Sequence, residues 1–133
     1  IAAHNEEERI REKLDNTLEI DYPRELLDII VASDCSGDAT DEITGSYAER
    51  GIRLGRADER QGKEYARLCA IRASKREILV FSDVATLIPG DALRILASRF
   101  EDEQVGALSS EDRFISTDGR VEWPDHRLWR RGH

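Results

Sequence analysis

Leu26-Leu27-Asp28-Ile29-Ile30-Val31-Ala32-Ser33-Asp34 is the stretch that decides the fold. Apart from Asp28, the run is apolar up to Ala32, and it ends in a serine and an aspartate. A nearly continuous apolar run is typical of a strand that is buried on both faces, as in parallel sheets. The sequence therefore predicts a strand over residues 26–32, in a sheet that helices cover on both sides.

A helix is predicted before this strand, over residues 6–19. Ile10, Leu14 and Leu18 recur every four residues, which is the spacing of one helix face. Asn5 is a good N-cap, and the glutamates at positions 6–8 suit the positive end of the helix dipole. Asp21-Tyr22-Pro23 then ends the helix before the strand begins.

Helices and strands continue to alternate after the strand. A helix is predicted from Asp38 to Arg50, and Gly51 stops it. The elements that follow are a short strand over 52–54, a helix over 63–74, a strand over 78–83, a helix from Pro89 to about residue 100, and a strand over 105–109. Such alternation with short connections predicts an α/β fold, a Rossmann-like and mostly parallel sheet with helices on both faces.

The composition limits the classes of function. The chain has 133 residues and a formal net charge of −8, which disfavours a general nucleic-acid or anionic-membrane surface. No apolar run approaches the ~20 residues of a membrane span. Two cysteines without a disulfide framework indicate a reducing compartment. We expect a cytoplasmic protein that binds no nucleic acid, or one held at the cytoplasmic face of a membrane in its intact form.

Three polar segments fall beyond the carboxyl ends of the predicted strands, where ligands bind in such sheets. They are Ala3-His4-Asn5-Glu6, Asp34-Cys35-Ser36-Gly37-Asp38 and Asp83-Val84-Ala85-Thr86. Asp34 can accept hydrogen bonds from the base or ribose of a nucleotide, or it can cap the turn that follows it. We expect a small-molecule site at this edge of the sheet.

Two cationic residues could bind a diphosphate directly, and one carboxylate could bind it through a metal ion. Arg60 and Lys63 flank a predicted helix start, where cations and backbone amides bind anions; a solvated basic loop is the alternative. Asp83 can ligate a divalent cation, Mg²⁺ or Mn²⁺, that bridges two phosphates, or it can contact the ribose. Ala85 stands two residues later and has no side-chain oxygen, so only one carboxylate is available to a metal there.

Taken in order, these segments resemble the family-2 glycosyltransferases, which have the GT-A fold. The order and spacing agree from residue 1 to about residue 110. The matching segments are Ala2-Ala3-His4-Asn5-Glu6, Thr17-Leu18, Asp21-Tyr22-Pro23, residues 29–40, Arg60-Gln61-Gly62-Lys63, residues 77–83, residues 89–93 and residues 105–109.

The resemblance implies a nucleotide-sugar donor, often a UDP-sugar, a saccharide or lipid acceptor, and inversion at the anomeric carbon. It implies that Asp34 contacts the base, and that Asp83 serves the ribose or a metal-diphosphate unit. The nucleotide-binding residues expected from it are Ala3, Asn5, Glu6, Asp34, Arg60, Lys63 and Asp83.

Parts of the family pattern are missing. Ala85 stands where the second aspartate of the family's Asp-x-Asp lies. We expect a nucleotide-sugar-binding domain over residues 1–110, with its first strand largely missing, and an unassigned polar tail over residues 111–133. We expect the general base outside this chain. The expected function is the donor-binding portion of an inverting glycosyltransferase; the alternative is a non-catalytic α/β nucleotide-binding or interaction module.

Overall fold

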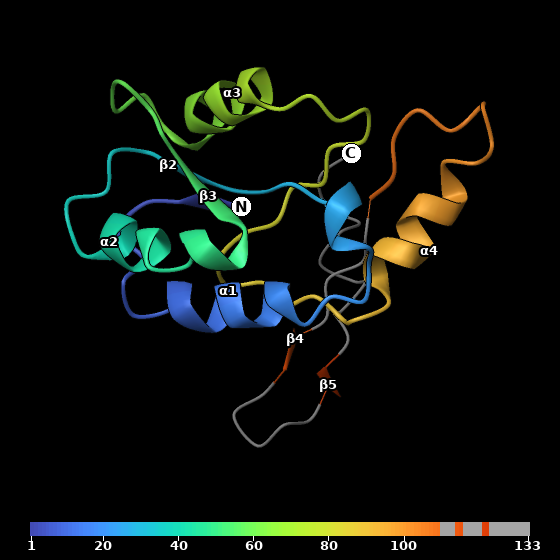
Figure 1. Cartoon of the computed structure of the whole chain (residues 1–133), viewed down its shortest axis with the longest axis horizontal. Helices are drawn as coiled ribbons and strands as arrows, with labels where there is room; N and C mark the ends of the chain where they lie inside the picture. The colour runs from blue at the N-terminus through green and yellow to red at the C-terminus, as the bar shows by residue number, and fades with distance from the viewer. Residues whose placement is uncertain (110–113, 116–120, 123–133) are drawn as a thin grey trace, which may run out of the picture. The chain divides into compact units, whose positions relative to one another are not determined.

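The computed structural model describes residues 1–109, 114–115 and 121–122 (Figure 1). The chain divides into two compact units, Ile1–Ser98 and Arg99–His133. The elements up to residue 99 are β1 (Ala2–Ala3), α1 (Ile10–Leu18), the 3₁₀ helix η1 (Arg24–Leu26), β2 (Ile29–Ser33), α2 (Thr40–Gly45), the 3₁₀ helix η2 (Ala48–Arg50), β3 (Ile52–Arg56), α3 (Lys63–Ala73) and α4 (Ala92–Arg99). The second unit contains β4 (Phe114–Ile115) and β5 (Val121–Glu122), an antiparallel pair in the stretch where the sequence predicted no element.

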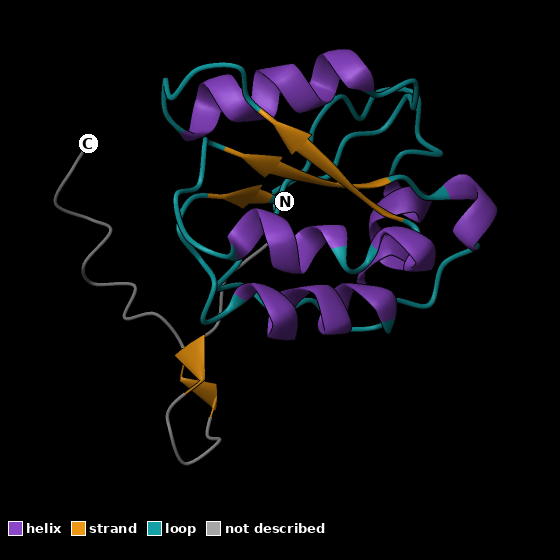
Figure 2. Cartoon of the chain, turned by 60° about the vertical axis from the view of Figure 1, so that its left-hand side comes forward, coloured by secondary structure: helices purple, strands orange, loops and turns teal. Residues whose placement is uncertain are grey.

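The first unit is built around a parallel sheet with the strand order β1-β2-β3. β2 pairs with β3 along its whole length, from Ile29 opposite Ile52 to Ser33 opposite Arg56. α3 covers one face of this sheet, and α1 and α2 lie on the other (Figure 2). The predicted α/β fold, with a parallel sheet between helical layers, is confirmed.

Both faces of β2 are packed, as its apolar sequence predicts. Toward α1, the side chains of Ile10 and Leu14 are completely buried in one core with Val31 and Ile52. Toward α3 the core consists of alanines, with Ala66 of the helix over Ala32 of the strand, among others. Small side chains let the helix backbone approach the sheet closely, and this brings the start of α3 near the carboxyl end of β2.

Two helix predictions were wrong at their ends. α1 begins at Ile10 rather than at residue 6, and Asn5 does not cap it. Asn5 instead has φ of 50°, and its side-chain oxygen accepts a hydrogen bond of 2.8 Å from the backbone of Gly37. The helix expected over 38–50 is broken into α2 and η2, because Gly45 and Ser46 are poor helix formers and the Ser46 hydroxyl bonds the Ile43 carbonyl at 2.6 Å.

Residues 78–83 do not form the regular strand that their apolar sequence predicts. Only Asp83 makes a parallel bridge, with Ala2, and the Ser82 carbonyl accepts a hydrogen bond of 3.3 Å from the Ala2 amide. A strand needs a hydrogen-bonded neighbour, and β1 is two residues long, so it provides one for the end of this segment alone. The preceding side chains, from Ile78 to Phe81, are 41–57% exposed. The strand expected over 105–109 is likewise absent from the described part of the chain.

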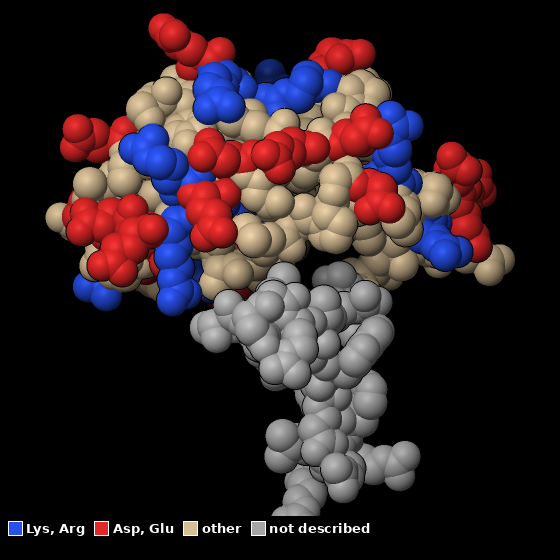
Figure 3. Space-filling model, turned by 90° about the horizontal axis from the view of Figure 1, so that it is seen from below, with Lys and Arg blue, Asp and Glu red and all other residues tan. Residues whose placement is uncertain are grey.

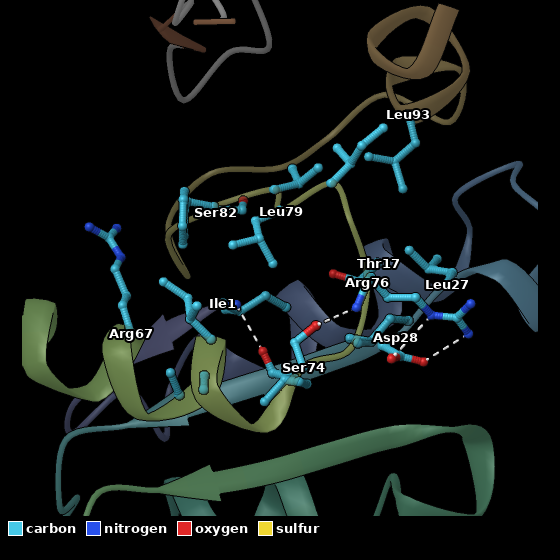
Figure 4. Close-up of a pocket in the computed structure, with 18 of the residues that line it drawn as sticks. Ile1, Thr17, Leu27, Asp28, Arg67, Ser74, Arg76, Leu79, Ser82 and Leu93 are labelled. Carbon is cyan, nitrogen blue, oxygen red and sulfur yellow. Dashed lines mark hydrogen bonds and ion pairs between the residues drawn. The ribbon is translucent and has the colours of Figure 1, made fainter. Parts of the chain in front are cut away.

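A slot lies beside β1, between β2 and residues 78–82 (Figure 4). Its cavity has a volume of about 170 Å³ and is mostly apolar. The lining includes Ile1, Leu27, Ile30, Ile71, Leu79 and Leu93. The Ile1 amine points into it and donates to the Ile30 carbonyl at 2.9 Å, and burial lowers the pKa of this amine to about 6. The slot is therefore an apolar cavity bordered by the backbone of β2 on one side and by residues 78–82 on the other.

Among the residues that the structure describes, no helix has the length and apolar character needed to cross a membrane.

Candidate functional site

Three backbone segments meet at the carboxyl edge of the sheet. The Asp34 amide donates to the Ala3 carbonyl at 2.9 Å, and the His4 ring lies 2.7 Å from the Asp34 carbonyl. On the other side of β1, Ala2 pairs with Asp83. Asp34 and Asp83 therefore flank the end of β1, Asp34 after the strand β2 and Asp83 at the end of a segment that makes a single bridge.

Asp34 joins the end of β2 to the start of α3. It is only 6% exposed, and its Oδ1 accepts a hydrogen bond of 3.3 Å from the backbone N–H of Gly62. Gly62 has φ of 93°, a left-handed conformation that favours glycine, and it directly precedes Lys63, the first residue of α3. The Asp34 side chain thus bonds the amide before α3, 28 residues away, and not an amide of the turn that directly follows it. Its nucleotide-binding role stays a prediction.

Asp83 is bound by two cations of α3. The Nζ of Lys63 lies 2.9 Å from its Oδ1, and Nη2 of Arg67 lies 3.0 Å from the same oxygen. The hydrogen bond from Lys63 and the positive charges of Lys63 and Arg67 lower the pKa of the Asp83 carboxyl, against a smaller opposing effect of burial. Asp83 is therefore an anion at neutral pH, half exposed, at the mouth of the site.

A third cation, Lys13 of α1, lies close to the group formed by Asp83, Lys63 and Arg67, which we call the Asp83 corner. Its side chain is completely buried, and its amine donates to the Ser82 hydroxyl at 2.6 Å and to the Thr86 carbonyl. Burial lowers the pKa of Lys13 to about 8, and the Asp83 charge opposes this shift. Lys13 thus fixes the two ends of the segment 82–86, on which Asp83 lies.

The Asn5-Glu6 turn is held by the loop after β2. The Asn5 amide donates to the Ser36 hydroxyl at 3.2 Å, and the Glu6 amide donates to the Thr40 hydroxyl at 2.8 Å. These bonds fix the backbone beside Ala3 and Asp34. Arg60 is not brought into the cluster: it is exposed and makes no hydrogen bond or ion pair within the described residues.

Arg67 and Lys13 were missed by the sequence prediction. Arg67 had a usable signal, because it lies four residues after Lys63 and so shares its helix face. Lys13 had none, because its position on the apolar face of α1, beside Leu14, is unusual for a lysine.

The residues at Asp83 do not fit a divalent cation well. Ala85 has no side-chain oxygen, and Oδ1 of Asp83 already accepts bonds from two positively charged groups. Across the described residues, no three side chains of His, Cys, Asp or Glu are grouped so that they could hold a metal ion. The arrangement is better suited to an anion, which the fork of Arg67 and the amine of Lys63 can bind directly.

One face of the described part of the chain has mixed charge. The face seen from below carries acidic side chains interspersed with basic ones (Figure 3). With a net charge of −8, the convergence of Lys13, Lys63 and Arg67 on one corner is a local feature and not part of a general basic surface.

Comparisons with known proteins agree with this geometry. The profile of Glycosyl transferase family 2 matches residues 1–133, and the chain belongs to this family. It is 42% identical over 50 residues to the probable glycosyltransferase YdaM of Bacillus subtilis (strain 168), a match that covers 38% of this chain and 12% of YdaM. The expected family membership is confirmed.

Solved structures show the same fold. The mannosyltransferase PcManGT from Pyrobaculum calidifontis, solved with GDP-Man and Mn²⁺, is 35% identical with a TM-score of 0.77. That match covers 84% of this chain and 34% of PcManGT. S. aureus TarS 1-349 in complex with UDP-GlcNAc has a TM-score of 0.68 at 18% identity, over 86% of this chain and 36% of TarS 1-349. The fold is thus the GT-A fold, and the chain spans about a third of the length of these structures.

Proposed function

We propose that this chain is the donor-binding portion of an inverting glycosyltransferase that takes a sugar from a nucleotide diphosphate and transfers it to an acceptor hydroxyl. The observation that supports this most is the meeting of Asp34, Lys63 and Asp83 at the carboxyl edge of the parallel sheet. Ligands of open α/β sheets bind at this edge. Family membership and the nucleotide-sugar complexes of PcManGT and TarS support the same ligand class.

In the proposed complex the base lies against Asp34, whose carboxylate can accept a hydrogen bond from a base N–H. The diphosphate lies at the start of α3, near Lys63, where the helix dipole and the amine both favour negative charge. The Asp83 carboxylate then faces the ribose of the bound nucleotide. The Asn5-Glu6 turn, bonded to the loop after β2, forms the wall next to the nucleotide.

In the proposed reaction, a carboxylate outside this chain takes the proton of the acceptor hydroxyl. The acceptor oxygen forms a bond to the anomeric carbon as the bond from that carbon to the diphosphate oxygen breaks. The nucleoside diphosphate leaves with the bonding electrons, and attack from the opposite face inverts the configuration. Lys63 is placed to stabilise the negative charge of this leaving group.

Calorimetry with UDP and with GDP tests donor binding. We expect weak but saturable binding of at least one of them, and sugar transfer by this chain alone that is slow or undetectable, because the base lies outside it. Asp34→Asn should weaken binding by about tenfold, because one acceptor becomes a donor at the base. Asp91→Asn, at an exposed position, is the matched control.

A second candidate function is a non-catalytic α/β module that has kept the family fold. Ala85 and the engagement of Asp83 by two cations favour it, because both depart from a metal-bound donor site. It predicts no binding of UDP or GDP at millimolar concentration, with or without Mn²⁺, while the chain remains folded.

A further inference from the structure

The corner around Asp83 contains more positive than negative charge. Lys63, Arg67 and Lys13 all act on the Asp83 carboxyl. Among the described residues, the one other anion bonded to these cations is Glu64, which accepts from Nη1 of Arg67 at 2.6 Å. Three positively charged side chains and two carboxylates therefore lie together, which leaves a local excess of one positive charge. A divalent cation placed here would be repelled by groups within a few ångströms, and this repulsion is significant near a protein surface.

Arg67 is already held in position for an anion. Its side chain is 23% exposed, and its guanidinium lies over the Phe81 ring at 5.7 Å and bonds both Glu64 and Asp83. A guanidinium fixed in this way loses little conformational entropy when it binds a phosphate. Lys63 differs, because half of its side chain is exposed and, among the described residues, its amine bonds Asp83 alone. It can therefore exchange that carboxylate for another anion without disturbing the core.

We propose that Lys63 and Arg67 bind the donor diphosphate directly, with Asp83 as the internal counter-ion that keeps both side chains in place when the site is empty, so that donor binding needs no divalent cation. This inference rests on the proposed function and specifies how its diphosphate is recognised. Lys63 and Arg67 would neutralise the negative charge of the diphosphate, as a metal ion does in other donor sites. Ala85 then leaves out a carboxylate that would only repel the diphosphate.

Calorimetry of UDP and GDP with the 133-residue chain, in excess EDTA and in Mn²⁺, is the central test. We expect the dissociation constant to differ by less than about threefold between the two conditions. Lys63→Gln and Arg67→Gln should each weaken binding in EDTA by about tenfold or more, because each removes a charge-assisted hydrogen bond. Arg72→Gln, an exposed position on the same helix, should leave the affinity unchanged.

Ala85→Asp provides the converse variant. A second carboxylate beside Asp83 should weaken UDP and GDP binding in EDTA by about tenfold, and Mn²⁺ should restore it, so that the variant becomes metal-dependent. Circular dichroism melts show whether each variant folds. If Arg67→Gln unfolds, the affinity of Lys63→Gln in EDTA tests the proposal by itself, because Lys63 is exposed and its substitution removes no packed side chain.

The outcomes separate the two proposals. Binding that appears only with Mn²⁺ in the unsubstituted chain would overturn the metal-free inference and leave the donor-binding function intact. An unchanged affinity in Lys63→Gln would also overturn it. The absence of UDP and GDP binding under every condition would overturn the proposed function itself, and this inference with it.

Discussion

The amine of Lys13 lies 2.6 Å from the hydroxyl of Ser82, although 69 residues separate the two along the chain. The lysine is fully buried in α1, and it holds the segment that presents Asp83. Burial lowers its pKa from 10.5 to about 8. Between these values the unfolded chain binds a proton that the folded chain lacks, so the free energy of unfolding gains a contribution that rises with pH.

We therefore expect Lys13→Met to change the pH dependence of stability. Urea titrations at pH 7.5 and about 9.5 would measure the free energy of unfolding below the range in which tyrosines ionise. The unsubstituted chain should gain stability across this interval relative to Lys13→Met, which has no proton to lose there. Parallel curves for the two proteins would show that the buried amine does not titrate in this range.

Asp83→Asn should cost little stability. The Asp83 ion pairs with Lys63 and Arg67 are partly exposed, and such pairs contribute about 0.2–1 kcal/mol. Because the folded pKa of Asp83 is lowered, the stabilisation is present above its ordinary value of 3.8 and is lost as the pH falls through the folded value. Urea titrations at pH 7 and at about pH 3 should show the difference between the two proteins shrinking at the lower pH. A loss of several kcal/mol at neutral pH would indicate a structural role that the observed contacts do not explain.

The slot beside β1 should accept an extended apolar segment as a strand. Ala2 is in register with both Ala32 and Asp83, so residues added before Ile1 would run between β2 and the segment 78–82. Five added residues rich in valine and isoleucine should raise the free energy of unfolding by at least about 2 kcal/mol, through buried apolar area and new backbone hydrogen bonds. Hydrogen exchange at residues 78–82 should slow in parallel.

A Gly-Ser extension of equal length is the control for this experiment. It supplies backbone groups but no apolar side chains and has low strand propensity. Equal stability of the two extended proteins would contradict a strand-binding slot.

Gly51 is a position where an added methyl group should be costly. It caps η2 with φ of 88°, and a Cβ there would lie 2.8 Å from Nη2 of Arg24, whose guanidinium bonds the Arg50 carbonyl. Gly51→Ala should lower the free energy of unfolding by about 1–2 kcal/mol. Gly45→Ala is the matched control: in α2 its Cβ meets nothing within 4 Å, so it should be neutral or stabilising. Thermal melts of the two variants should therefore shift in different directions or by clearly different amounts.

The sequence predicted best those elements whose pairing and packing partners lie nearby in the chain. Most of the strand predicted over 26–32 forms β2, although β2 begins only at Ile29 because Leu26 lies in η1. Gly62 and Lys63 mark the start of α3, where the local pattern and the tertiary contacts agree. The strand predicted over residues 78–83 was wrong for a physical reason. Their composition suits a strand, but strand formation depends on a neighbouring strand that a local pattern does not report.

The candidate site was predicted in part for a similar reason. Asp34, Lys63 and Asp83 could be placed at one edge because they follow strand ends or begin a helix, and the structure brings them together. The partners of Asp83 could not be deduced in full. A buried lysine is recognised only when the packing of α1 against residues 82–86 is known.

The long sequence separation between α1 and this corner also affects the order of assembly. Asn16 bonds both the amide and the carbonyl of Ile88, 72 residues away, next to the bonds of Lys13 to Ser82 and Thr86. Closing such a long loop costs entropy before its contacts form. During synthesis, α1 must therefore wait until residue 88 has left the ribosome before its buried lysine finds its partners.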